Sequence, residues 1–118
     1  MLTDRVIPSL SRLIRDNYHL SVLFLRWNHF TPKCAQVLFS ALGQNKGLKI
    51  IDLSFNSLGG AHVGEMFRNN RTLVHVDLGF TKIKDGDRES IGEGLRQNHS
   101  VLGIHIQGNE RLGFDTKG

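Results

Sequence analysis

Four segments of the chain repeat the same pattern of aliphatic residues, and this repeat constrains the fold more than any other feature. Each segment carries aliphatic residues at its first, fourth and sixth positions. The segments begin at Leu20, Leu48, Leu73 and Val101, so successive starts are 28, 25 and 28 residues apart. A nearly fixed period of this length predicts a stack of similar units, each of which buries its apolar side against its neighbours.

The same register aligns polar residues. The ninth position holds Asn28, Asn56, Thr81 and Asn109. Where a strand turns out of a sheet, backbone N–H and C=O groups lose their ladder partners, and a buried Asn side chain can both donate to them and accept from them. We therefore predict a structural ladder of these four side chains, in which Thr81 supplies one group fewer than an Asn. A further Asn precedes each segment by three residues: Asn17, Asn45, Asn70 and Asn98.

Between the aliphatic segments, the spacing of apolar residues changes to that of a helix. Apolar residues recur there every three or four positions, as on the buried side of an amphipathic helix. Thr31 followed by Pro32 is a typical helix start, with an N-cap residue and then proline at the first helical position. The expected helices span about 3–17, 32–45, 60–70 and 86–98. The three residues that the second repeat lacks correspond to about one helical turn.

The pattern L-x-x-L-x-L-x-x-N-x-L, followed by a helical stretch, resembles the leucine-rich repeat. The 28-residue period is similar to that of the ribonuclease-inhibitor type, in which each repeat contributes one strand and one α-helix. The resemblance implies an α/β solenoid of about 3.5–4 repeats, with parallel strands on the concave face and helices on the convex face. The chain departs from the pattern at Thr81, at Arg111, which replaces an apolar residue, and in its 25-residue repeat.

A chain of 118 residues is long enough for one domain. We expect a capping helix, three repeats and a truncated last repeat, at residues 1–19, 20–47, 48–72, 73–100 and 101–118. No apolar run is long enough for a membrane-spanning helix, and charges interrupt the apolar residues at the N-terminus, unlike in a signal peptide. The single cysteine, Cys34, fits a reducing compartment, so we expect a cytoplasmic protein with no membrane partner.

Side chains at the third, fifth and seventh positions of each segment alternate with the core positions and point away from the core. Together with the eighth position, they give a candidate binding face for a protein, because aromatic and Arg side chains dominate protein interfaces. The candidate partner-binding residues are Phe24, Arg26, Trp27, Asp52, Phe55, His75, Asp77, Phe80, His105 and Gln107. For the aromatic residues at the eighth position, two interpretations stay open: contact with a partner, or packing against one another.

The sequence contains no pattern that predicts catalysis. The row Asp52, Asp77 and His105 has the residue types of a metal site, but it lies on an open sheet without further ligands, and aspartate at the fifth position is common in this kind of repeat. No nucleophile motif and no phosphate-binding loop is present. We therefore expect no catalytic residues, no metal, no cofactor and no enzymatic activity.

Three functions are consistent with these features. The first is a non-catalytic interaction module or scaffold that binds a protein through the concave sheet. The second, implied by the resemblance, is a regulator of an enzyme, such as an activator or inhibitor of a small GTPase. The third is nucleic-acid binding, because residues 1–50 hold seven Lys or Arg and two Asp or Glu. Since no basic residues are adjacent, a solvated helix face is favoured over a nucleic-acid partner.

The last segment predicts a contact between two copies of the chain. No helix follows residues 101–106 to cover them, so this strand is a candidate open edge. Two such edges can pair antiparallel about a two-fold axis, which gives a closed dimer. We therefore expect a homodimer formed through residues 101–114. The alternative is that further repeats of a longer parent protein cover this edge.

Overall fold

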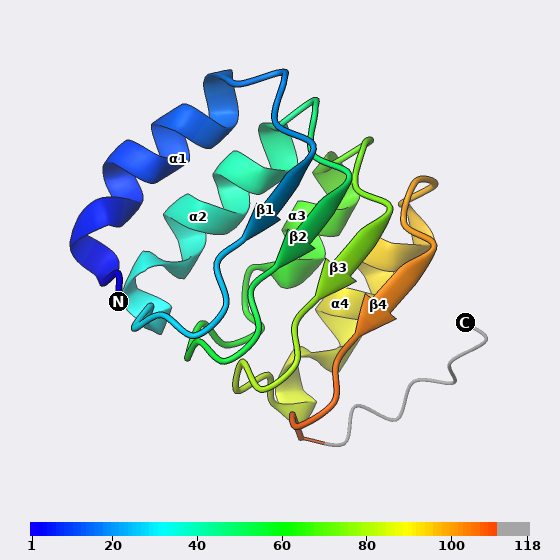
Figure 1. Ribbon diagram of the computed structural model, residues 1–118. Helices are drawn as coiled ribbons and strands as arrows, with labels where there is room; N and C mark the ends of the chain where they lie inside the picture. The colour runs from blue at the N-terminus through cyan, green and yellow to red at the C-terminus, as the bar shows by residue number, and fades with distance from the viewer. Residues whose placement is uncertain (111–118) are drawn as a thin grey trace.

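Four short parallel strands form one sheet in chain order, and a row of helices covers one of its faces (Figure 1). The computed structural model describes residues 1–110. The strands are β1 (Val22–Phe24), β2 (Ile50–Asp52), β3 (His75–Asp77) and β4 (Gly103–His105). Residues at the same repeat position pair with each other, as Ile51 does with Leu23 and Val76. The register read from the sequence is therefore the register of the sheet.

Each strand follows a helix, and β1, β2 and β3 each precede another. The helical elements are η1 (Asp4–Val6), α1 (Ile7–Asp16), α2 (Pro32–Gln44), α3 (Val63–Asn69), η2 (Asp85–Asp87) and α4 (Arg88–Arg96). The start of α2 has the expected geometry, since the Thr31 side chain accepts a hydrogen bond from the Lys33 N–H at 3.3 Å. Helix α3, with seven residues, belongs to the 25-residue repeat. None of the helices in residues 1–110 has the length and hydropathy needed to cross a membrane.

The core lies between the sheet and the helices. Its side chains come from the fourth and sixth strand positions and from the inner faces of the helices, as the two periodicities predict. Completely or almost completely buried members include Ile51, Leu53, Val76, Leu78, Leu38, Phe39, Met66, Phe67 and Ile91. Leu23 and Ile104, on the two outer strands of the described sheet, are only partly buried, because within residues 1–110 each has a neighbouring strand on one side only.

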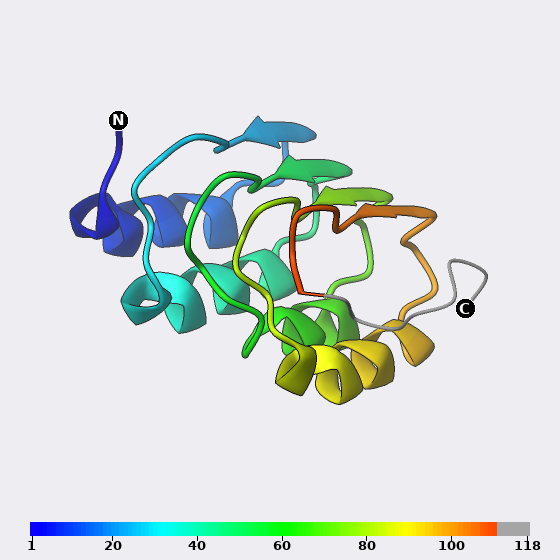
Figure 2. The same ribbon diagram turned by 90° about the horizontal axis from the view of Figure 1, so that it is seen from below.

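The two layers differ in spacing, and this difference curves the stack. Neighbouring strands lie about 4.8 Å apart, whereas packed helices need about 8–10 Å. The helical layer is therefore the longer one, and the sheet is on the concave side (Figure 2). The prediction of an α/β solenoid with concave strands and convex helices is confirmed.

One close contact joins the last two helices. A Cβ atom built on Gly94 would lie 2.0 Å from the Gly64 backbone oxygen, and one built on Gly64 would lie 2.2 Å from the Ser90 oxygen. The backbones of α3 and α4 therefore touch where these two glycines face each other.

Part of the predicted last repeat cannot be compared with the structure. The predicted repeat runs to residue 118 and the predicted dimer contact to residue 114. Residues 111–118, with Arg111, lie outside the described residues.

Candidate functional site

The outward strand positions put the predicted partner-binding residues on the concave face, but their exposure differs. Phe24 on β1 is 66% exposed. Arg26 and His105 are also exposed, and His75 and Asp77 are half-buried. Asp52 differs from the expectation, because its side chain is buried.

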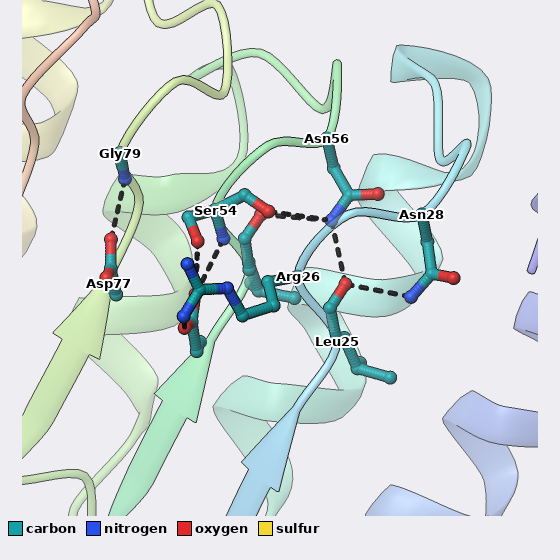
Figure 3. Close-up of polar contacts among 9 residues, drawn as sticks. Leu25, Arg26, Asn28, Ser54, Asn56, Asp77 and Gly79 are labelled. Carbon is teal, nitrogen blue, oxygen red and sulfur yellow. Dashed lines mark hydrogen bonds and ion pairs between the residues drawn. The ribbon is translucent and has the colours of Figure 1, made fainter. Parts of the chain in front are cut away.

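Asp52 is covered by residues of its own strand end and of the preceding repeat. Its Oδ1 accepts hydrogen bonds from the Ser54 hydroxyl at 2.6 Å and the Ser54 N–H at 2.9 Å. Its Oδ2 lies 3.7 Å from Nη1 of Arg26 (Figure 3). The carboxylate therefore positions Arg26 on the concave face. Asp77 repeats part of this arrangement by accepting from the Gly79 N–H at 2.9 Å.

The three aromatic residues at the eighth position form a continuous stack. The rings of Trp27 and Phe55 lie 3.9 Å apart with an interplanar angle of 5°, and those of Phe55 and Phe80 lie 4.6 Å apart at 7°. The faces of the three rings thus pack against one another, which is one of the two interpretations of the sequence. Trp27 and Phe80 nevertheless stay 53% and 45% exposed, so ring edges remain accessible.

The backbone explains why the rings are parallel. Trp27, Phe55 and Phe80 have φ angles of 60°, 59° and 53°, in the left-handed region that bulky residues rarely adopt. The same conformation in each repeat sends each ring off the strand end in the same direction. The fourth repeat has Gly108 here, with φ of 75°, and a Cβ on it would lie 2.2 Å from Cδ1 of Phe80. The stack therefore ends with the Phe80 ring on the Gly108 backbone.

The polar end of the concave face contains two histidines. The rings of His75 and His105 lie 4.6 Å apart and are tilted by 54°. The exposed Gln107 follows on the same chain segment. Within residues 1–110, no group of three or more His, Cys, Asp or Glu side chains is arranged to hold a metal ion. The arrangement offers hydrogen-bond donors and acceptors to a partner.

Beside this face, the Asn residues at the ninth position link successive repeats. Nδ2 of Asn56 donates to the Leu25 oxygen at 2.9 Å and to the Leu53 oxygen at 3.1 Å, so it joins two repeats (Figure 3). Its Oδ1 accepts from the Phe30 N–H at 3.3 Å. Thr81 has a single hydroxyl hydrogen. Its hydroxyl donates to the Leu78 oxygen of its own repeat at 2.7 Å and makes only a long contact of 3.5 Å with Oδ1 of Asn109 in the next repeat.

A second set of Asn residues links the repeats at the other end of the strands, a role that their recurrence in the sequence does not reveal. Asn70 is completely buried. Its Nδ2 donates to the Leu42 oxygen at 2.8 Å and the Asn45 oxygen at 3.4 Å, and its Oδ1 accepts from Thr72 N–H at 2.8 Å and Leu73 N–H at 2.7 Å. The equivalent Asn residues before β2 and β4 make the corresponding bonds.

The single cysteine lies at the start of α2 and away from the concave face. Burial of Cys34, with a hydrogen bond to Asp4 and the charge of that residue, raises the pKa of the thiol to about 12. Burial also acts to raise the pKa of Asp4, but hydrogen bonds from the Thr31 side chain and backbone outweigh it and lower that pKa overall. At neutral pH the thiol is protonated, as in a core residue.

The comparisons with known proteins agree with this architecture. A family model described as "Leucine Rich repeat" matches residues 69–92. The chain is 33% identical over 105 residues to a "Protein phosphatase 1 regulatory subunit 37 homolog" of Caenorhabditis briggsae, and 32% identical to the protein of that name from Caenorhabditis elegans. Each match covers 85% of this chain but only 11% of the relative.

Solved structures share the fold at low sequence identity. The tropomodulin C-terminal domain of Caenorhabditis elegans superposes with a TM-score of 0.75 and 12% identity, over 91% of this chain and 68% of that domain. A structure named "Leiomodin-1 Actin-Binding Site 2" gives a TM-score of 0.74 and 16% identity, over 86% of this chain and 63% of the other. The repeat pattern, the family model that matches residues 69–92 and the shared fold together show that the chain has a leucine-rich-repeat fold.

Proposed function

We propose that the chain is a non-catalytic interaction module that binds a protein through the concave face of its sheet. The observation that carries this proposal is the exposure of Phe24, which leaves 66% of a large aromatic side chain in solvent at the β1 end of an outward-facing row. Arg26 follows two residues later and is held by the buried carboxylate of Asp52. An aromatic side chain beside a positioned Arg is the composition typical of binding hot spots.

The contact surface extends from this pair across the sheet. Ring edges of the stack border it on one side, and the histidines and Asp77 supply polar groups towards β4. The proposed contact residues are Phe24, Arg26, Trp27, Phe55, His75, Asp77, Phe80, His105 and Gln107. Val22, which is 38% exposed on β1, joins them although the sequence pattern did not single it out. We also propose a cytoplasmic location, since the one cysteine is buried and unpaired.

The test compares two exposed apolar side chains on opposite faces. Immobilised wild type, Phe24→Ala and Val37→Ala would each be incubated with cell extract, and a protein retained by the wild type would then be purified and titrated by calorimetry. Val37 is the control, because it is 49% exposed on the convex helix α2. We expect Phe24→Ala to cost about 2 kcal/mol of binding free energy and Val37→Ala almost nothing. Equal affinities of the two variants would reject the concave face.

A second function, regulation of an enzyme, is supported by the relatives. Their name describes them as homologues of a regulatory subunit of protein phosphatase 1, and the similarity covers most of this chain. The regulated enzyme under this proposal is a phosphatase and not the small GTPase considered from the sequence. The chain spans only 11% of the relatives, so the proposal requires that the matched region itself contacts the enzyme.

This second function has a direct test with a purified enzyme. The catalytic subunit of protein phosphatase 1 would be titrated with the wild-type chain while dephosphorylation of a phosphopeptide is measured. We expect saturable binding and a change of rate that Phe24→Ala weakens and Val37→Ala preserves. An absence of binding in calorimetry would reject regulation through this region, while the interaction module would still be tested by the extract experiment.

A further inference from the structure

The loops that lead from each helix to the next strand lie side by side along one edge of the molecule, which runs from the top to the right in Figure 1. They comprise residues 17–21, 45–49, 70–74 and 97–102. We call these loops, with the last turn of each preceding helix, the basic rim. This edge is separate from the aromatic stack, which lies where the strands end.

The net charge of the whole chain is concentrated on this rim. Its charged side chains are Arg15, Asp16, Lys46, Lys49, Arg68, Arg71, Glu93 and Arg96, and all eight are exposed. Six of them are basic and two acidic, which gives a net charge of +4. The full chain also has a formal net charge of +4, so the basic and acidic residues outside the rim are equal in number. The excess of basic residues in the first half of the sequence therefore becomes, in the fold, a rim to which later repeats contribute.

The centre of the rim has no acidic residue. Glu93 lies 3.5 Å from Arg96 at one end, and Asp16 is next to Arg15 at the other. Helix dipoles favour basic side chains in the last turn, which explains Arg68. Lys46 and Lys49 lie beyond the end of α2, where this explanation is weaker. These central charges belong to two adjacent repeats.

One of the central charges is held in place by the backbone. Nη1 of Arg71 donates to the Arg68 oxygen at 2.6 Å and to the Asn70 oxygen at 3.2 Å. This contact keeps the guanidinium at the C-terminal end of α3. Adjacent repeats lie about 5 Å apart in the strand layer and up to about 10 Å apart in the helix layer. Both distances are comparable to the screening length of about 8 Å at physiological salt. The charges therefore act together on a ligand.

We propose that the basic rim, centred on Lys46, Lys49, Arg68 and Arg71, binds an extended acidic segment of a partner protein. In an extended chain, side chains on the same side recur about every 6.7 Å. This spacing is larger than that of neighbouring strands and smaller than that of neighbouring helices. A single-stranded nucleic acid has similar charge spacing but also needs aromatic side chains on which bases stack. Tyr18 is the one exposed Phe, Tyr or Trp side chain of the rim, so the rim offers no row of rings on which successive bases could stack, and this favours the peptide.

The experiment uses a fluorescent peptide of alternating Glu and Ser, about twelve residues long, so that its carboxylates share one side. Its affinity for the wild-type chain would be measured by fluorescence anisotropy at near-physiological salt. Lys46→Glu/Lys49→Glu reverses two charges on the rim. Lys82→Glu/Lys84→Glu is the matched control, because it changes the net charge equally at exposed positions beyond the opposite end of β3.

We expect the rim variant to lose at least about tenfold in affinity and the control variant about twofold or less, since charge effects are strongest at the contact. Phe24→Ala should bind the peptide like the wild type, because the concave face is a different surface. Circular dichroism of both charge variants checks that they are folded. Equal losses in the two double variants, or a loss with Phe24→Ala, would overturn the proposal. Tighter binding of an oligouridylate than of the peptide would assign the rim to nucleic acid instead.

Discussion

At the scale of single residues, the main feature is a costly backbone conformation that recurs in three repeats. Holding a bulky residue in the left-handed region costs about 1–3 kcal/mol. Trp27, Phe55 and Phe80 all adopt it. Stacking of each ring pair contributes about 0.5–1.5 kcal/mol beyond burial, so the stack offsets part of that cost.

Glycine and alanine at position 55 should therefore reverse their usual order of stability. Phe55→Gly and Phe55→Ala both remove the central ring of the stack, but only glycine adopts a φ of 59° without strain. We expect the Gly variant to be more stable than the Ala variant by about 1 kcal/mol. Urea unfolding of both proteins measures this difference. An Ala variant that is the more stable of the two would contradict the left-handed turn.

The buried Asn residues before the strands should be essential in the middle of the stack. Asn70→Ala leaves two N–H groups and two carbonyl oxygens without this partner, and each unsatisfied buried group costs about 1–3 kcal/mol. Asn17→Ala removes the acceptor for His19 N–H and Leu20 N–H in a half-buried loop, where water can replace it. We expect a much lower urea midpoint for the Asn70 variant. Equal midpoints would argue against a structural role of the Asn residues that precede the strands.

The cysteine should be unreactive in the folded protein and should couple stability to alkaline pH. Its pKa is raised from the usual 9.0 to about 12 by burial first and then by Asp4. The unfolded chain therefore loses this proton at lower pH than the folded chain does. The contribution of the protonated Cys34 thiol to the free energy of unfolding is therefore complete below pH 9.0 and is lost as the pH rises towards about 12. We expect maleimide to label Cys34 slowly near neutral pH unless urea is added. Rapid labelling of the folded chain would contradict its burial.

At the scale of elements, the close contact between α3 and α4 should reverse the usual effect of a glycine-to-alanine substitution on stability. Replacing an interior helical glycine by alanine normally stabilises a helix by about 1 kcal/mol. Gly94→Ala should instead destabilise, because its Cβ would lie 2.0 Å from the Gly64 oxygen and the two backbones must separate. Gly86→Ala is the control, since a Cβ at that residue would have open space for 4 Å around it. A Gly94 variant with a raised melting temperature would show that the helices pack less closely.

The elements were predictable from the sequence because one physical rule determines each of them. Period-two and helical spacing identify which residues face the core, so all four strands and the main helices lie where the pattern predicts them. Helix α3 begins at Val63 and not near residue 60, because the chain first turns at Gly59, which has a φ of 72°. The burial of Asp52, whose carboxylate lies 3.7 Å from Nη1 of Arg26, was not predictable in this way, and contact of Asp52 with a partner stays a prediction. Periodicity contains no information about such contacts.

At the scale of the whole molecule, exposed apolar side chains are distributed unevenly along the stack. Ten large apolar side chains are exposed in the described residues, and seven of them lie in residues 1–27. These seven are Met1, Leu2, Leu13, Tyr18, Val22, Phe24 and Trp27. The concave face is therefore apolar at β1 and polar towards β4, where the two histidines lie. A partner that binds it is therefore expected to place its own apolar residues over β1.

The opposite end of the stack carries the proposed contact between two copies. Gly103 N–H donates to the Val74 oxygen at 3.1 Å, and the His105 oxygen accepts from Leu78 N–H at 2.7 Å. Since successive residues of a strand direct their backbone groups to opposite sides, the N–H and C=O of Ile104 point away from β3. Two copies can pair these groups antiparallel about a two-fold axis, which closes as a dimer.

The best probe of this dimer is Leu102→Glu. Leu102 is 87% exposed beside the edge, so the variant adds a charge there without changing the core. Gly103→Pro is unsuitable because it would remove a hydrogen bond to β3. We expect light scattering to give twice the monomer mass for the wild type and for Val37→Glu, a control on the convex face, but the monomer mass for Leu102→Glu, since charges on an edge strand oppose pairing. A wild type that stays monomeric at every concentration would show that this edge does not pair with a second copy.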